Sequence, residues 1–362
     1  MKRPVVIALV ILGILVIAAI ATLSRGPMVL TKPEAPMPPN GRRIVSVPDM
    51  GEKIAPLPIY NVTMPEFRGI TKWWNTADGQ SLTPEKLRGK VVIIDFWTYS
   101  CINCIRTYPF LRSMHEKYAD KGLVIVGVHT PEFAFEADPK NVGREIEKNG
   151  LKYPIALDPD FATWNAYSNR YWPAEYFFDR QGRLRRTHFG EGEYGESELA
   201  IRSLLEEDGV ELSSMGETET MTPDFSKIKT PETYFGLLRG QEFMGTPGTN
   251  GTPVTLTASE KVEPNRWTAG GSWTFTPEYT QSDTAGAIFR FSIQANKLHL
   301  VLEAADGKDK MIEIFVDGIK TGEITINESD LYDIAEFPDA GRHTVELRLK
   351  DEGVRFYAAT FS

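Results

Sequence analysis

A run of apolar residues just before a pair of cysteines constrains this chain more than any other feature. Residues 91–97 read Val-Val-Ile-Ile-Asp-Phe-Trp, and Cys101 and Cys104 follow shortly after. A run this apolar is typical of a strand buried on both faces of a sheet. Because such a sheet is covered by helices, the run predicts an α/β domain.

The residues after this run indicate how the domain continues. A helix is expected to begin near Cys101, with Ser100 as its cap and a kink at Pro109. Five of its side chains are expected to point inward: Ile102, Ile105, Phe110, Met114 and Tyr118. The following elements predict a mixed sheet. They are a strand over 123–128, a helix from Asp138 to Asn149-Gly150, a hairpin of 175–179 and 184–189, and a helix over 197–207.

The remaining length points to a second domain of another class. A chain of 362 residues exceeds what one core usually organises. Beyond a linker at 209–229, apolar and polar residues alternate in several short stretches, and Asp306-Gly307 and Asp317-Gly318 are hairpin-turn pairs. This pattern predicts an antiparallel β-sandwich of jelly-roll type over 230–362. The α/β domain is assigned to 65–208.

The first residues are expected to carry the protein out of the cytoplasm. Lys2 and Arg3 precede an apolar run from Pro4 to Leu23, which is long enough to span a bilayer as a helix. The positive-inside rule then places the folded domains on the extracytoplasmic side of a single-pass membrane protein. A cleaved signal peptide is the alternative, since Ala19-Ile20-Ala21 offers a small-x-small site. Residues 24–64 are rich in proline and are interpreted as a semi-rigid stalk.

The two cysteines point to redox chemistry. They are the only cysteines of the chain, so they pair with each other or with another molecule. The free N–H groups at a helix start favour a thiolate at Cys101, and Cys104, one turn further, can attack a mixed disulfide. A zinc site needs four ligands, and the five histidines are scattered. We therefore expect no metal and no cofactor beyond a redox-active Cys101–Cys104 disulfide. A net charge of −9 argues against nucleic-acid binding.

Several segments resemble a known family. The run 92–97, the Cys-x-x-Cys motif and a proline five positions later resemble the thioredoxin active-site segment. The resemblance is closer to the extracytoplasmic DipZ/TlpA-like thiol–disulfide oxidoreductases and covers about residues 65–362. It rests on residues 96–104 (Phe-Trp-Thr-Tyr-Ser-Cys-Ile-Asn-Cys), 127–136 (Gly-Val-His-Thr-Pro-Glu-Phe-Ala-Phe-Glu), 169–176 (Asn-Arg-Tyr-Trp-Pro-Ala-Glu-Tyr) and 230–234 (Thr-Pro-Glu-Thr-Tyr).

The resemblance implies a thioredoxin fold, a carbohydrate-module-like β-domain and a role for individual residues. Cys101 would be the attacking thiol and Cys104 the resolving thiol, while Asp95 would assist proton transfer. Pro173 would be a cis-proline that faces the cysteines. The residues expected to line the substrate site are Trp172, Trp97, Tyr99, His129 and Glu132.

The same resemblance implies the partners. Exported proteins would supply the thiols or disulfides. DipZ proteins carry a multi-helix membrane domain that delivers electrons, and here a single helix stands in its place. The electrons would therefore come from a separate CcdA-like membrane protein. The pair Ile102-Asn103 lacks the His of strongly oxidising relatives, which favours a reductant.

Two other functions stay open at this point. Thr98 lies three residues before Cys101, as in a peroxiredoxin, although Ile94 stands where a proline is expected. A glycan-binding surface protein with an accessory redox domain is the second alternative. Its sugar-stacking rings would be Trp267, Trp273, Tyr279 and Tyr332, for which a place in the sandwich core is the competing interpretation.

Overall fold

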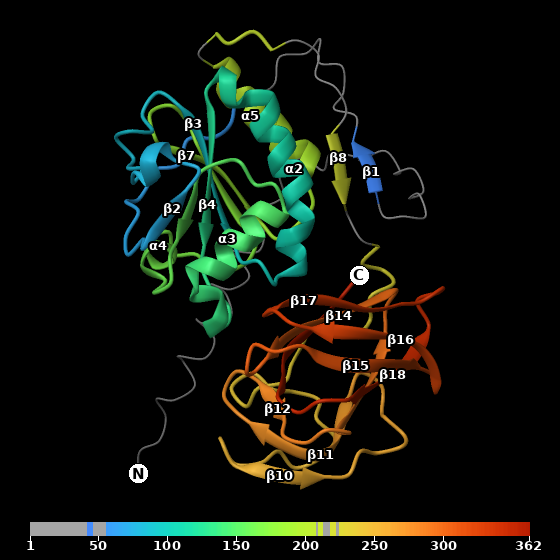
Figure 1. The fold of residues 1–362 in the computed structure, drawn as a ribbon. Helices are drawn as coiled ribbons and strands as arrows, with labels where there is room; N and C mark the ends of the chain where they lie inside the picture. The colour runs from blue at the N-terminus through green and yellow to red at the C-terminus, as the bar shows by residue number, and fades with distance from the viewer. Residues whose placement is uncertain (1–41, 46–55, 208, 213–217, 222–223) are drawn as a thin grey trace, which may run out of the picture. The chain divides into compact units, whose positions relative to one another are not determined.

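A computed structural model of the chain describes residues 42–45, 56–207, 209–212, 218–221 and 224–362 (Figure 1). The apolar segment 4–23, expected to be a membrane helix or a signal peptide, lies outside these residues. Among the residues described, no helix is both long and apolar enough to cross a bilayer.

The N-terminal domain is built on a mixed six-stranded sheet with the order β2-β5-β4-β3-β6-β7. The expected strand Val91–Trp97 is confirmed as β3, and all seven of its residues are buried. It pairs in parallel with β4 and antiparallel with β6. The other strands are β2 (Lys72–Trp74), β4 (Leu123–His129), β5 (Ile155–Leu157), β6 (Ala174–Phe178) and β7 (Leu184–Phe189).

Helices cover both faces of this sheet. Alternate residues of β3 enter two different cores: Val91, Ile93 and Trp97 belong to one, and Val92, Ile94 and Phe96 to the other. The first core also contains residues of α2 (Ile102–Tyr118), α3 (Pro139–Lys148) and α5 (Tyr194–Glu206), whereas the second contains Trp164 of α4 (Ala162–Ala166). Short 3₁₀ turns occur at η1 (Ala77–Gly79), η2 (Ala119–Lys121) and η3 (Ala134–Ala137).

Helix α2 differs in detail from the sequence expectation. Its N-cap is Cys101 and not Ser100, because the Cys101 Sγ accepts a hydrogen bond from the Cys104 N–H. The helix runs through Pro109, and Phe110, Met114 and Tyr118 are buried as expected. Ile102 and Ile105 are only half-buried, and the buried positions of the first turns are instead Cys104, Arg106, Thr107 and Tyr108.

Parts of the stretches assigned to linkers pair with other segments. The Tyr60 N–H donates to the Leu184 carbonyl at 3.0 Å, and the Met64 N–H donates to the Gly182 carbonyl at 2.9 Å. Residues 57–64 of the proline-rich stretch therefore run beside β7. In addition, β1 (Arg42–Val45) pairs antiparallel with β8 (Thr218–Met221), which joins the two expected linkers in a small ribbon.

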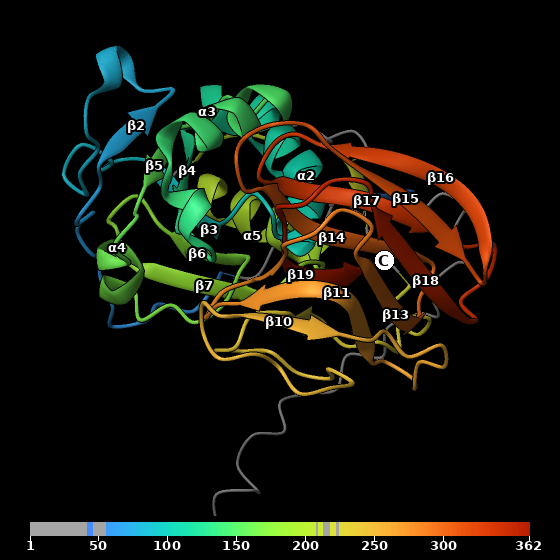
Figure 2. The ribbon, with the colours of Figure 1, turned by 60° about the horizontal axis from the view of Figure 1, so that its bottom comes forward.

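The C-terminal domain is all-β and antiparallel, as expected. Nine of its strands form one hydrogen-bonded path of the order β16-β15-β18-β13-β11-β12-β19-β14-β17. In this path β11 pairs with β13 along one half and with β10 and β12 along the other. Figure 2 shows β10, β11 and β13 among these strands. The two parts of the sheet are thus joined through β11, at the Gly270-Gly271 step where the pairing changes. The strands are β9 (Thr233–Tyr234), β10 (Pro253–Leu256), β11 (Trp267–Phe275), β12 (Thr280–Ser282), β13 (Ile288–Gln294), β14 (Lys297–Ala304), β15 (Lys310–Val316), β16 (Ile319–Ile326), β17 (Asp330–Glu336), β18 (Arg342–Leu349) and β19 (Val354–Phe361).

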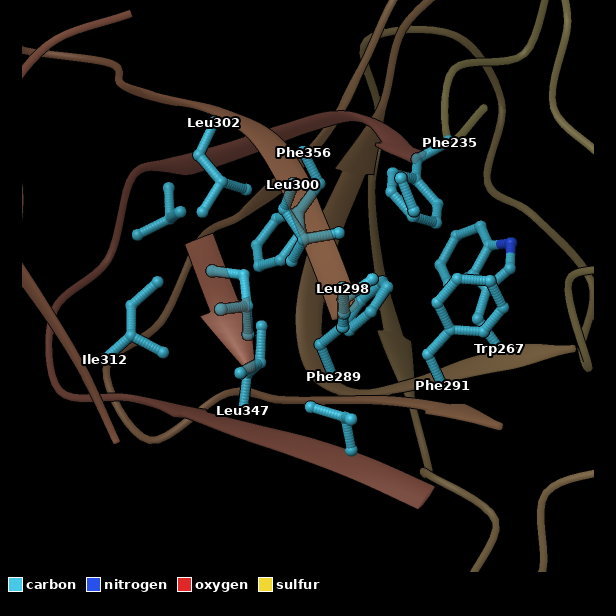
Figure 3. Close-up of a cluster of buried hydrophobic side chains, with 14 of the residues drawn as sticks. Phe235, Trp267, Phe289, Phe291, Leu298, Leu300, Leu302, Ile312, Leu347 and Phe356 are labelled. Atoms are coloured by element: carbon cyan, nitrogen blue, oxygen red, sulfur yellow. The ribbon is translucent and has the colours of Figure 1, made fainter. Parts of the chain in front are cut away.

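The core of this domain contains aromatic side chains proposed above as sugar platforms. Figure 3 shows Trp267 beside Phe289 and Phe291 in the interior, and the Trp267 and Phe289 rings are stacked with centroids 5.4 Å apart. Trp273 is also fully buried. Tyr279 and Tyr332 are half-buried. None of the four rings is exposed, which favours the competing interpretation of a place in the core for Trp267 and Trp273.

Candidate active site: the cysteine pair and the groups behind it

The two cysteines lie where β3 leads into α2. Cys101 is half-buried at the helix start, and Cys104 is fully buried one turn further. The Cys104 N–H lies 3.4 Å from the Cys101 Sγ, which places a hydrogen-bond donor against that sulfur. Burial, followed by the neighbouring Cys101, raises the pKa of the Cys104 thiol. The geometry therefore offers one accessible sulfur and one protected, protonated sulfur.

Asp95 lies behind Cys104 with no hydrogen-bond partner in the described part of the chain. Its side chain is fully buried, and both carboxyl oxygens lack a donor. Burial first, and then the charge of Glu175, raise the pKa of Asp95 well above its usual range. A buried carboxyl without partners is costly, which fits a group that exchanges a proton.

Three residues that were expected to contact the substrate, Trp97, Tyr99 and His129, are instead buried beneath the cysteines. Trp97 and His129 are fully buried, and Tyr99 is nearly so. The rings of Tyr99 and His129 are stacked with centroids 5.7 Å apart, and the rings of Trp97 and His129 meet edge to face with centroids 4.8 Å apart. Burial lowers the pKa of His129 to about 3, so it is neutral. These side chains support the site from beneath and present no surface to a client.

Glu136, which the sequence analysis missed, holds the loop before Cys101. One carboxylate oxygen accepts from the Ser100 hydroxyl at 2.7 Å and from its N–H at 3.2 Å. The other accepts from the N–H groups of Glu132 at 2.6 Å and Phe133 at 2.9 Å. This fully buried acid thus ties the residue before the first cysteine to the loop after β4. An acid three residues after the first residue of a turn often accepts a hydrogen bond from that residue's N–H, as Glu136 does from Phe133. This spacing was the signal in the sequence that could have identified Glu136.

The peptide bond between Trp172 and Pro173 is cis, as expected. Pro173 is buried and Trp172 is half-buried, with the Trp172 Nε1–H donating to the Thr130 carbonyl at 3.1 Å. Trp172 and Cys101 both pack against the core that lies under α2. Tyr171, immediately before Trp172, is exposed.

The expected site residue Glu132 is engaged by the C-terminal domain. Its carboxylate accepts from Arg239 at 2.7 Å and from the Tyr234 hydroxyl at 2.9 Å. Two other hydrogen bonds link the surroundings of the cysteines to that domain: the Tyr99 hydroxyl donates to the Ser329 carbonyl at 3.1 Å, and Arg106 of α2 donates to the Phe361 carbonyl at 2.9 Å. Glu132 therefore joins the two domains and is not free to bind a client.

Glu175 is a second functional candidate that the sequence analysis missed. It lies opposite Asp95 in the pairing of β3 with β6, and only 3% of its surface is exposed. The signal was present, because an acid within the apolar strand Ala174–Phe178 is as unusual as Asp95 within β3.

Each of the two domains is similar to a known protein family. Residues 61–187 match the AhpC/TSA family, and residues 230–362 match the family described as thioredoxin like C-terminal domain. The thiol–disulfide oxidoreductase YkuV of Bacillus subtilis is 36% identical over 140 residues, which cover 38% of this chain and 90% of YkuV. The chain belongs to the thioredoxin-like thiol–disulfide oxidoreductases. It is therefore an oxidoreductase, as the sequence analysis expected.

Its likeness to DipZ is also confirmed and extends further along the chain. Protein DipZ of Mycobacterium bovis is 39% identical over 244 residues, which are 66% of this oxidoreductase and 35% of DipZ. The chain thus spans about a third of the length of these curated relatives. Among solved structures, a thioredoxin-like protein in its oxidised form is 33% identical, with a TM-score of 0.37 over 40% of this chain and 95% of that one.

Proposed function

We propose that this oxidoreductase reduces disulfides in exported proteins through Cys101 and Cys104. The observation that carries the proposal is the asymmetry of the pair: Cys101 is partly accessible at a helix start, and Cys104 is buried one turn behind it. The Cys101 thiolate attacks a client disulfide and forms a mixed disulfide. The Cys104 sulfur then bonds to the Cys101 sulfur, and the second client sulfur leaves as a thiolate.

The cellular setting is part of the same proposal. The apolar segment 4–23 supports a place outside the cytoplasm, with the protein anchored in the cell membrane by one helix. After each cycle the Cys101–Cys104 disulfide must be reduced again. A CcdA-like membrane protein is the proposed electron donor, and Asp95 is the proposed base for Cys104.

Trapping tests the assigned order of the two thiols. In Cys104→Ser the resolving thiol is absent, so mixed disulfides between Cys101 and exported proteins should accumulate and be released by dithiothreitol. Cys101→Ser is the matched control and should trap none. Equal trapping by both variants, or trapping by Cys101→Ser alone, contradicts the assignment.

Titration against glutathione buffers tests the direction of electron flow. A reductant should have a Cys101–Cys104 potential well below that of the glutathione couple, because its dithiol must give up electrons readily. A potential as high as those of oxidising relatives would reverse the proposed direction while leaving thiol–disulfide exchange intact.

The peroxidase alternative is less well supported by the geometry. The Thr98 hydroxyl lies 3.4 Å from His129 Nε2, beneath the site, and it also interacts with Glu136. A peroxidatic role would require this hydroxyl to serve Cys101. Measuring consumption of hydrogen peroxide by the reduced chain separates the two functions, since a reductase of protein disulfides should show none above the rate of an ordinary thiol.

A further inference from the structure

A row of three titratable side chains crosses the sheet behind Cys104. Asp95 of β3 lies directly opposite Glu175 of β6, and Glu175 lies directly opposite His188 of β7. Directly opposed residues of antiparallel strands point to the same face, with Cβ atoms about 4.5–5.5 Å apart. The row therefore leads from the groups beneath α2 to β7, the edge strand of the sheet.

Every member of this row has a buried polar atom that lacks a partner among the described residues. These atoms are both carboxyl oxygens of Asp95, the Oε2 of Glu175 and the Nε2 of His188. Isolated polar atoms in a protein interior are rare, because burying a donor or acceptor without a hydrogen bond is costly. Four such atoms on three neighbouring residues indicate that these side chains serve a function and do not stabilise the fold.

The two carboxyls of the row influence each other. Burial raises the pKa of Glu175 to about 7, opposed by the nearby Arg186 and by the Ser197 hydroxyl. The hydroxyls of Tyr153 and Tyr194 also face Glu175 and remain neutral, since burial raises the pKa of both. The charge of Glu175 also raises the pKa of Asp95, so above about pH 7 the pair carries a single negative charge on Glu175 while Asp95 stays protonated.

His188 connects the row to solvent. Its ring is 9% exposed, and burial lowers its pKa, so the ring is neutral at physiological pH. The Nδ1 lies 3.3 Å from the Glu193 carboxylate, which is 62% exposed. A neutral imidazole beside a carboxylate holds its hydrogen on the near nitrogen, which leaves the buried Nε2 as an acceptor.

We propose that Glu175 and His188 form a proton route between Asp95 and the edge of the sheet, and that the Asp95–Glu175 pair acts as one base for Cys104. Glu175 and His188 are positioning residues in this scheme, since they act through Asp95 and touch no client. The inference deepens the proposed function and rests on it, because it concerns the step in which Cys104 resolves the mixed disulfide.

The Cys104 proton passes to the Asp95 carboxylate, the Cys104 sulfur bonds to the Cys101 sulfur, and the bond from Cys101 to the client sulfur breaks. The client sulfur leaves with the electron pair as a thiolate, so the client disulfide is reduced and the cysteine pair is oxidised. At the outset Asp95 holds the proton of the pair and Glu175 is charged. Asp95 passes this proton to Glu175, which frees its own carboxylate to accept the Cys104 proton, and Glu175 gives its proton through His188 to solvent as the Cys104 proton arrives. The pair returns to one charge and one proton.

Stopped-flow reduction of a chromogenic aromatic disulfide by the full chain tests the proposal. The first thiolate released reports attack by Cys101, and the second reports resolution by Cys104. In Glu175→Gln the pH midpoint of the second phase should fall by about one unit or more, because the neighbouring charge that holds Asp95 protonated is gone. The first phase should keep its pH dependence.

A second variant and a spectroscopic measurement exclude a purely structural explanation. In His188→Gln the second phase should slow about tenfold and recover when imidazole is added, because a small base can replace the missing proton carrier. NMR of the carboxyl carbons should show Asp95 titrating at lower pH in Glu175→Gln than in the unaltered chain. Glu145→Gln, which alters a buried acid of α3 outside the row, is the matched control and should change neither phase.

The outcomes separate this inference from the proposed function. If the unaltered chain releases one thiolate and never the second, dithiol exchange itself fails. If both phases are present but Glu175→Gln leaves the midpoint of the second phase and the titration of Asp95 unchanged, the proton route is wrong. Loss of activity in His188→Gln without rescue by imidazole would likewise assign that residue to folding and contradict the route.

Discussion

The buried Glu175 should make the stability of the fold depend on pH in an unusual direction. Its pKa rises from the ordinary 4.5 to about 7, so the folded chain holds this proton more tightly than the unfolded chain. The free energy of unfolding should therefore fall as the pH rises from about 4.5 to about 7, by about 3 kcal/mol for this group alone. Below about pH 4.5 the carboxyl is protonated in both the folded and the unfolded chain, so the free energy of unfolding no longer changes with pH through this group.

Glu175→Gln should remove this dependence. Urea unfolding at pH 4 and pH 8 should show a smaller difference for the variant than for the unaltered chain, with the gain in stability confined to the higher pH. Glu145→Gln provides the comparison, since Glu145 forms ion pairs with Arg144 and Lys148 and should lose stability when its charge is removed. A larger loss at high pH in Glu175→Gln would show that this carboxylate is stabilising when charged.

The difference in exposure between the two cysteines predicts which one reacts first. Cys101 is partly accessible and Cys104 is fully buried, and burial raises the pKa of the Cys104 thiol. Iodoacetamide at mildly acidic pH should therefore label Cys101 at least tenfold faster than Cys104. Mass spectrometry of the digested chain measures the ratio directly. Equal labelling of both sulfurs is the result that this geometry does not allow.

At the scale of elements, the start of α2 depends on one acid from outside the helix. Glu136 accepts four hydrogen bonds, two of them from Ser100. Glu136→Gln exchanges an acceptor oxygen for an NH₂ group, so at least one donor is left without a partner. We expect a loss of about 2–3 kcal/mol in the free energy of unfolding.

The same variant should also slow resolution of the mixed disulfide, because Ser100 directly precedes Cys101. Chemical denaturation and the second phase of the chromogenic assay measure the two effects. The exposed Glu147 of α3 offers the control Glu147→Gln, which should change neither quantity by a detectable amount. An unchanged stability in Glu136→Gln would mean that the loop finds other acceptors.

The hairpin of β15 and β16 allows backbone conformation to be tested apart from packing. Its turn residues Asp317 and Gly318 have φ values of 51° and 83°, as the sequence pair predicted for a tight turn. A Cβ at Gly318 would meet no atom within 4 Å, so Gly318→Ala changes only the backbone preference and should cost about 1 kcal/mol. Gly322→Ala, equally open but without a positive φ, should be neutral or slightly stabilising.

Elements with a strong local pattern were predictable from the sequence, and contacts between distant elements were not. The apolar run of β3, the alternation in β13 to β15 and the Asp138 cap of α3 all appear where expected. The short elements β2, β5 and α4 were missed because three to five residues carry too little periodicity.

The candidate site divides in the same way. The cysteines lie three positions apart and form a recognisable motif, and Asp95 is the single charged residue of an apolar strand. Glu175 meets Asp95 only through the pairing of β3 with β6, eighty positions away, and the burial of Tyr99 and His129 depends on how their rings stack. Sequence patterns identify such residues as unusual, but the register of a sheet decides which of them meet.

At the scale of the whole chain, the cysteine chemistry should survive removal of the C-terminal domain. Both cysteines, the acids behind them and the cis-proline lie before residue 208, within the range 65–208 assigned to the first domain from the sequence. Because residues 57–64 run beside β7, a fragment of 56–212 is the better one to make. It should reduce insulin at a rate comparable with that of residues 56–362, since no sulfur or proton-transfer group is lost.

The fragment should nevertheless be less stable than the longer chain. It lacks the Phe361 carbonyl that Arg106 contacts and the Tyr357 ring that packs on Phe133 and Phe135. Thermal unfolding followed by circular dichroism, alongside the insulin assay, distinguishes loss of structure from loss of chemistry. A fragment that is folded but unable to exchange disulfides would place part of the active site in the C-terminal domain.

The position of β19 in its sheet sets an order in which the chain can become structured during synthesis. This strand, the last one described, lies between β12 and β14 and also pairs with β9. Until Val354–Phe361 has emerged from the ribosome or an export channel, β12 and β14 each present an unpaired edge that can join with other chains. The redox domain meets no such delay, because its sheet is complete at Phe189 and its last helix at Glu206. The cysteines can therefore be enclosed in their native surroundings while the rest of the chain still needs protection from aggregation.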